Sequence, residues 1–121
     1  MLNFFSVGIG AAVGACLRYA ISRALPTEFP YGTLISNVAA AFLIGFVIGA
    51  ERNTGALPER VKLLITTGLL GGLSTFSTFS METIAMLETR NYAGAGANVL
   101  LNVGICLFCV AAGLAIARLV S

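Results

Sequence analysis

The chain has 121 residues, of which 58% are hydrophobic and 10% are charged, and its mean hydropathy is +0.95. A soluble domain carries charge on about a quarter of its residues, so this composition excludes an ordinary soluble domain and predicts a chain surrounded by membrane lipid. The net charge of +2, without a basic run, excludes nucleic acid as a partner. His and Asp are both absent, and with them the usual general base and metal ligands, so we do not expect an enzyme.

Several uncharged stretches are long enough to cross a membrane, for which a helix needs roughly 20 residues. Polar backbone groups in lipid must bond within their own segment, so these stretches predict helices. No basic residue precedes the first stretch, which predicts a retained helix rather than a cleaved signal peptide. We therefore expect an all-α membrane protein with one transmembrane domain over residues 1–121 and four spans at about 2–24, 31–50, 62–87 and 93–118.

The first helix carries Gly10 and Gly14 on one face, and Arg18 continues that face. Glycines at this spacing let helix backbones approach closely, so we expect tight packing. An arginine in a span either extends to the membrane surface or bonds to carbonyls and carboxylates. Its small-residue face favours the second arrangement for Arg18. The same glycine spacing recurs in the second and third spans, as Gly45-xxx-Gly49 and Gly68-xxx-Gly72.

The second helix carries an asparagine, Asn37, in the middle of its span, one turn after Thr33. An amide in hydrocarbon is costly unless it is paired or hydrated. Asn37 is therefore a candidate functional residue.

The third span contains the unusual run Gly71-Gly72-Leu73-Ser74-Thr75-Phe76-Ser77-Thr78-Phe79-Ser80. Adjacent glycines followed by closely spaced hydroxyl residues disfavour an uninterrupted helix. We expect a broken third helix whose freed carbonyls and hydroxyls line a site at mid-membrane depth. Carbonyls at the end of the first half-helix suit a small cation, and the hydroxyls can donate to an anion. Hydroxyls that bond only their own helix at i−4 are the alternative.

Phe76 and Phe79 lie three residues apart and share a helix face. Their spacing alone favours two lipid-facing or core side chains. The functional alternative uses the partly positive ring edge, which can solvate a small anion weakly enough for conduction. Glu82 ends this polar run, either at an aqueous vestibule or at the membrane boundary.

The fourth helix carries a stripe of polar and small residues at helical spacing, formed by Asn98, Asn102, Cys106, Cys109 and Gly113. Helix–helix hydrogen bonding and pore lining are equally compatible with the two asparagines. The two cysteines lack a second ligand pair, so a metal site there is not expected.

The Lys and Arg residues of the short loops predict only a weak orientation. One side of the membrane collects Arg52, Arg60, Lys62 and Arg118. The other collects Arg23 and Arg90, with Arg18 close behind. Such a small bias allows insertion in both orientations, which makes an antiparallel two-fold homodimer possible.

Taken together, these residues resemble the Fluc (CrcB-type) fluoride channels. The resemblance covers nearly the whole chain and is most specific in the third span. Its matching motifs are Gly14-x-x-x-Arg18-Tyr19, Gly32-Thr33-Leu34-x-x-Asn37, and the run from Gly71 to Ser80 followed by Glu82. The resemblance implies an integral, multi-pass protein of the bacterial inner membrane, forming a dual-topology antiparallel homodimer. It also implies passive export of cytoplasmic fluoride through two pores, with a structural sodium ion on the two-fold axis.

By the same resemblance, Asn37 would donate to the fluoride ion, and Phe76 and Phe79 would supply ring edges. Ser77 and Thr78 would join a polar track along the pore. The sodium ligands would be the main-chain carbonyls of each subunit's Gly71 and Ser74, while vestibule and structural roles would fall to Arg18 and Glu82. The chain departs from the family in two places: threonine is common where it has Ser74, and a fourth-span tyrosine is replaced by Asn98.

The nearest rival is a small dual-topology multidrug transporter, which also has four spans. Such a proton-coupled pump needs an embedded carboxylate, whereas the charge within the first span is Arg18, and the chain has no Trp to enclose a cationic drug. A purely structural assembly factor is the third possibility, but it leaves the polar run of the third span without a purpose.

Overall fold

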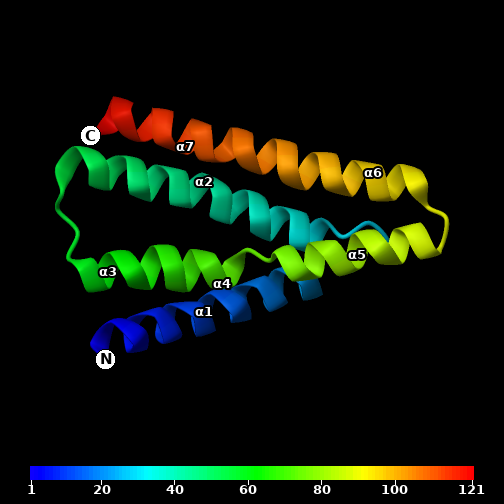
Figure 1. The fold of residues 1–121 in the computed structure, drawn as a ribbon, viewed down its shortest axis with the longest axis horizontal. Coiled ribbons are helices and arrows are strands. Elements are labelled where there is room, and N and C mark those ends of the chain that lie inside the picture. The colour runs from blue at the N-terminus through cyan, green and yellow to red at the C-terminus, as the bar shows by residue number, and fades with distance from the viewer.

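The computed structural model describes residues 1–121 as four antiparallel helical spans joined by short turns (Figure 1). The first two spans are unbroken helices, α1 (Leu2–Ala24) and α2 (Tyr31–Thr54). The third span consists of α3 (Glu59–Leu63), the π-helical η1 (Leu64–Leu70), α4 (Gly71–Leu73) and α5 (Phe76–Glu88). The fourth consists of α6 (Tyr92–Leu100), the π-helical η2 (Leu101–Ile105) and α7 (Cys106–Val120). All four are long and apolar enough to cross a membrane, which confirms the predicted all-α, four-span architecture.

The turns use residues that end or begin helices. α2 stops at Gly55, whose left-handed backbone (φ 59°) closes the helix with a bond from its N–H to the carbonyl of Glu51. The side chain of Asn91 caps α6 by accepting from the N–H of Gly94 at 3.0 Å. Both termini and the α2–α3 turn lie at one end of the molecule, and the other two turns lie at the opposite end (Figure 1).

Close packing follows the small residues of the spans. α1 lies against η1 and α4, and α2 lies along α7. A methyl group on Gly14 would collide with the main-chain oxygen of Leu69. One on Gly45 would collide with the main-chain oxygen of Val110. The glycine pairs therefore mark tight helix contacts, as their spacing predicted.

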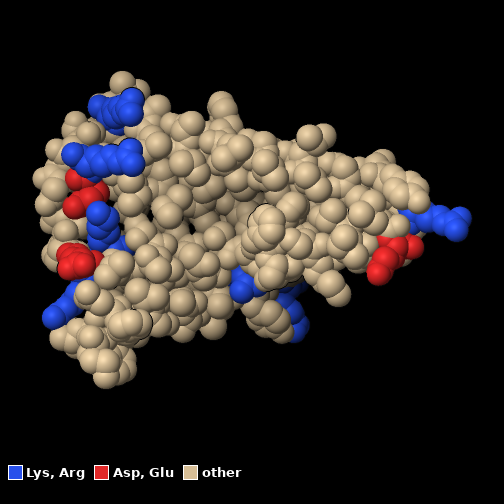
Figure 2. All heavy atoms as spheres, viewed as in Figure 1, with Lys and Arg blue, Asp and Glu red and all other residues tan.

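The outside of the molecule is apolar along its length and charged at its ends. Only 21 of the 121 residues are buried, and large hydrophobic side chains are exposed on all four spans. Figure 2 shows charged side chains gathered at the two ends of the long axis, with a further basic group beside α1. This distribution suits lipid rather than water around the middle of the molecule. The chain is an integral, multi-pass membrane protein.

Candidate functional site

The third span is interrupted at Ser74 and Thr75, whose backbones are extended (φ −81°, ψ 154° and φ −151°, ψ 121°). The break follows the glycine pair rather than coinciding with it, because Gly71 and Gly72 are still helical in α4. Gly72 instead allows close packing on α1: a methyl group there would approach the main-chain oxygen of Ala11 to 2.5 Å. The helix resumes when Thr75 Oγ1 accepts from the N–H of Thr78 at 3.2 Å, which caps α5.

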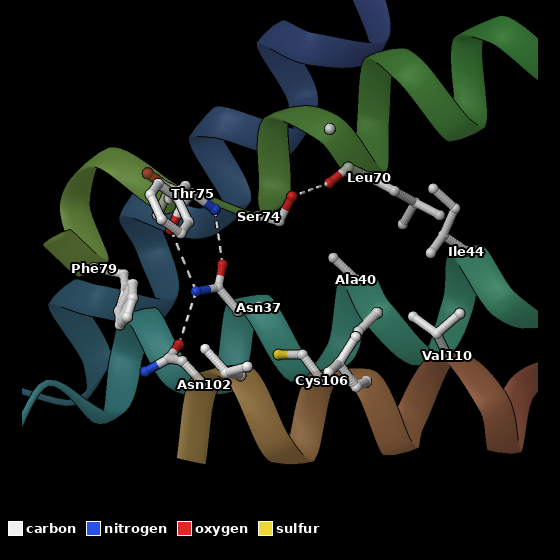
Figure 3. Close-up of a pocket in the computed structure, with 15 residues that line it drawn as sticks. Asn37, Ala40, Ile44, Leu70, Ser74, Thr75, Phe79, Asn102, Cys106 and Val110 are labelled. Atoms are coloured by element: carbon white, nitrogen blue, oxygen red, sulfur yellow. Dashed lines mark hydrogen bonds between the residues drawn. The ribbon is translucent and has the colours of Figure 1, made fainter. Parts of the chain in front are cut away.

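Asn37 of α2 bridges this break (Figure 3). Its Oδ1 accepts from the N–H of Thr75 at 2.7 Å, and its Nδ2 donates to the carbonyl of Thr75 at 3.3 Å. One side chain thereby pairs both main-chain groups of a residue that has left the helix. Nδ2 also donates to Oδ1 of Asn102 at 2.9 Å, so the amide joins three spans.

The break frees main-chain oxygens. In a continuous helix the carbonyl of Gly71 would accept from the N–H of Thr75, but that N–H is bonded to Asn37. The carbonyl of Ser74 likewise loses the N–H of Thr78, which is bonded to the Thr75 hydroxyl. No backbone hydrogen bond outside the helices ends on either oxygen. Two unpaired acceptors thus lie within one helical turn.

The break faces a cavity of about 370 Å³ formed by α2, the third span and the fourth span. Its wall includes five of the nine residues to which the sequence assigned a site role: Asn37, Gly71, Ser74, Phe76 and Phe79. The remaining polar or sulfur-bearing lining comes from Thr75, Asn102 and Cys106, and the rest is aliphatic. Polar groups converging on an apolar cavity at the break of a membrane helix form the candidate site.

The two phenylalanines meet edge to face beside the cavity. Their ring centroids are 5.4 Å apart with an interplanar angle of 66°. Phe79 is 7% exposed and belongs to the core, whereas Phe76 is 78% exposed and lies on the surface of the molecule. The cavity is therefore open on the side that Phe76 borders.

The hydroxyls of residues 74–80 make their hydrogen bonds within the third span itself. Those of Ser74 and Ser80 donate to the carbonyls four residues earlier, which is the arrangement given above as the alternative to anion binding. Ser77 and Thr78 do not line the cavity. They lie on the first turn of α5, within 3.4 Å and 3.1 Å of the Thr75 hydroxyl.

Arg18 and Glu82 lie outside the cavity wall. Arg18 Nε donates to the carbonyl of Gly72 at 3.1 Å, so this arginine is bonded to a main-chain oxygen of α4. That bond matches the carbonyl anchoring favoured by its small-residue face. Glu82 is partly exposed, and its Oε1 is buried without a hydrogen-bond partner.

The sequence left the roles of Asn98 and Asn102 open, and the structure shows both making hydrogen bonds between spans. Asn102 bonds to Asn37 and also lines the cavity. Asn98 is fully buried and bonds to Asn102 and to Thr83. The sequence signal for these bonds was the stripe of polar residues. It shows that the side chains lie on one helix face but does not show which residues they bond.

The chain is similar to known proteins over nearly its whole length. A family model described as CrcB-like protein, Camphor Resistance (CrcB), matches residues 5–114. A Clostridium perfringens protein named Fluoride-specific ion channel FluC is 44% identical over 117 residues, which cover 93% of this chain and 91% of that protein. Proteins of the same name from Clostridium novyi and Cupriavidus pinatubonensis are 43% and 45% identical, covering 94% and 99% of this chain and 92% and 98% of their own. These matches confirm the resemblance carried by the third-span motif, and the chain belongs to the CrcB-like protein family.

Proposed function

We propose that this chain is the subunit of a passive, fluoride-selective channel that exports cytoplasmic fluoride across the bacterial inner membrane. Its family membership and the name shared by its relatives support the substrate. The observation that carries the proposal is the break at Ser74 and Thr75, where an amide, freed main-chain oxygens and two phenylalanine rings meet at one open cavity.

The cavity wall offers the groups that a small anion needs when it leaves water. Phe76 and Phe79 line the cavity, and the edges of their rings are partly positive. Asn37 offers an N–H whose bond to the Thr75 carbonyl is its longer one, 3.3 Å against 2.9 Å to Asn102. An ion can replace that longer bond without disturbing the shorter. Each of these contacts is weak enough to be broken again, as conduction requires.

Ser77 and Thr78 continue the polar path beyond the cavity. Both lie on the first turn of α5, next to the Thr75 hydroxyl. Their hydroxyls can rotate to donate to a passing anion. Glu82 lies one turn further along α5, where we assign it to the vestibule, and Arg18 has a structural role through its bond to Gly72.

A second copy of the chain completes the pathway in this proposal. One subunit leaves Phe76 78% exposed and the cavity open, so it encloses no pore by itself. The weak Lys and Arg bias permits both insertions, and an antiparallel pair would bring two such cavities against partner surfaces. Two equivalent pores per homodimer, surrounded by membrane lipid, follow from that symmetry.

We assign a structural sodium ion to the carbonyls of Gly71 and Ser74. The donor set fits: both oxygens are without backbone hydrogen bonds, and unwound main-chain carbonyls are common ligands for sodium in membrane proteins. One subunit supplies two such oxygens, and a two-fold axis beside them doubles the set. The ion would supply positive charge that holds two carbonyl-rich breaks together.

The direction of transport follows from acid–base chemistry. Hydrogen fluoride is a weak acid that crosses lipid in its neutral form and dissociates inside the cell, where the anion is trapped. A negative-inside potential drives the anion out through a passive pathway with about 2.3 kcal/mol per charge per 100 mV. The chain carries no G-x-x-x-x-G-K-[ST] nucleotide motif, and the proposed export needs none.

A growth assay tests this function against the rival multidrug transporter. The chain is expressed in a bacterial strain that lacks its own fluoride exporter, and growth is measured in fluoride and in cationic drugs. We expect restored growth in fluoride and unchanged drug sensitivity. Protection against drugs without protection against fluoride would contradict the proposal and favour the transporter.

A further inference from the structure

Two asparagines of the fourth span are buried in the interior of the molecule. Asn98 is 0% exposed and is among the largest fully buried side chains, and Asn102 is 5% exposed. A buried amide destabilises a fold unless its polar atoms are bonded. Both asparagines are bonded, and their partners form a continuous path.

The path begins at the break and crosses to the fourth span. The N–H of Thr75 donates to Asn37 Oδ1 at 2.7 Å, and Asn37 Nδ2 donates to Asn102 Oδ1 at 2.9 Å. Asn102 Nδ2 then donates to Oδ1 of Asn98 at 2.9 Å. Each amide accepts on one side and donates on the other.

The path returns to the third span one turn beyond the cavity. Asn98 Nδ2 donates to Thr83 Oγ1 at 2.9 Å, and that hydroxyl donates to the carbonyl of Phe79 at 2.8 Å. We call Asn37, Asn102, Asn98 and Thr83 the amide chain. It starts and ends on the main chain of the same broken span.

The two main-chain ends fix the direction of every link. The N–H of Thr75 can only donate, so Asn37 must turn its oxygen toward it and its nitrogen toward Asn102. The carbonyl of Phe79 can only accept, so Thr83 must donate to it and accept from Asn98. Both ends are consistent with the same order of donors and acceptors along the path. The oxygen and nitrogen positions of all three amides therefore follow from their hydrogen-bond partners.

We propose that Asn98, Asn102 and Thr83 are positioning residues that hold Asn37 with its N–H toward the ion pathway and keep Ser74 and Thr75 extended. This inference rests on the proposed function for its effect on transport. Loss of a link leaves Asn37 held by Thr75 alone, so its N–H is held toward the pathway less firmly and Ser74 and Thr75 are less restrained. The amide chain therefore favours fluoride entry even though neither Asn98 nor Thr83 contacts the ion.

Substitutions at Thr83 test the amide chain. Thr83 does not line the cavity, so its replacement changes the hydrogen bonds and leaves the cavity wall as it is. Thr83→Val keeps the shape and removes the hydroxyl, whereas Thr83→Ser keeps the hydroxyl. In reconstituted liposomes we expect Thr83→Val to lower fluoride release per protein by between about twofold and tenfold, the effect of one hydrogen bond. Thr83→Ser should release fluoride at the wild-type rate. Asn102→Leu should lower release by about tenfold or more.

Hydrogen–deuterium exchange of residues 71–80 gives a second readout that does not depend on transport. We expect faster exchange in Thr83→Val and Asn102→Leu, and wild-type exchange in Thr83→Ser. Asn53→Ala is the matched control, because Asn53 also bonds between spans, to Ser121 Oγ at 2.7 Å, at the far end of α2. Its exchange over residues 71–80 and its fluoride release should stay at wild-type values.

Wild-type exchange over residues 71–80 in Asn102→Leu and Thr83→Val would overturn the amide chain. Equal loss of protection in Asn53→Ala would also overturn it, since the effect would then be general loosening. Absence of fluoride release from the wild-type protein would contradict the proposed function. Hydrogen–deuterium exchange alone would then decide whether the amide chain positions Asn37.

Discussion

Phe76 and Phe79 share a helix face, yet their surroundings differ. Phe79 is 7% exposed and packs within the subunit, while Phe76 is 78% exposed beside the open cavity. Replacing the buried ring therefore alters both packing and the proposed pathway. Replacing the exposed ring removes an edge from the proposed pathway and leaves the core of the chain unchanged, so Phe76 separates function from stability.

Phe76→Ile should slow fluoride release from reconstituted liposomes by about threefold to tenfold, the value of a weak ring-edge contact. The proposed dimer should still form, as measured by size-exclusion chromatography in detergent. Phe108→Ile is the control, because Phe108 is 72% exposed on the fourth span and does not line the cavity. Unchanged release in Phe76→Ile would return this ring to an ordinary lipid-facing role.

Residue types and spacing singled out the polar and aromatic members of the cavity wall, among them Asn37 and Phe79. They did not identify Asn102 as the partner of Asn37, because a stripe on one helix gives a direction and no distance to the next helix. The π-helical η2 contains Asn102 and rotates the residues after it relative to a regular helix. Such a local change of pitch is not visible in hydrophobic periodicity.

At the scale of elements, the third span combines a break in the helix with close glycine packing against α1. The sequence predicted an interruption within residues 71–80, and the extended residues are Ser74 and Thr75. Gly72 is still helical and packs closely against α1 at Ala11. Composition shows where a helix is weak, whereas tertiary packing decides which residue leaves it.

Glycine-to-alanine substitutions on α1 test the packing argument. Gly14→Ala should lower stability by about 1–3 kcal/mol, because its methyl group meets the main-chain oxygen of Leu69 and the backbones must separate. Gly8→Ala should be neutral or slightly stabilising, because nothing lies within 4 Å of its added methyl group and alanine favours helix. Thermal unfolding in detergent measures both. Equal stability of the two variants would contradict the close approach of α1 and η1.

For the whole molecule, the even number of spans puts both termini on one side of the membrane. The four spans were readable from uncharged stretches, because lipid imposes helices of a known length. Pairing between subunits was not readable in the same way, since lipid-facing and partner-facing surfaces are both apolar. The orientation of each molecule in the membrane is therefore the property that tests the proposed antiparallel dimer, because such a dimer needs both orientations.

Protease-accessible tags at each terminus should show molecules in both orientations. In any one molecule the two tags must lie on the same side, which provides an internal control. A variant with lysines added beyond Ser121 should insert mainly one way and release less fluoride, because loop charge sets orientation. A wild-type chain found in a single orientation would remove the antiparallel dimer.

The central claim is that the broken third span forms a pathway for fluoride and excludes larger halides. Purified wild-type protein reconstituted into liposomes loaded with fluoride and chloride tests it most directly, with ion-selective electrodes recording release after a potassium ionophore clamps the membrane potential. The account predicts rapid fluoride release with chloride retained. Equal release of both ions, or retention of both, would contradict it.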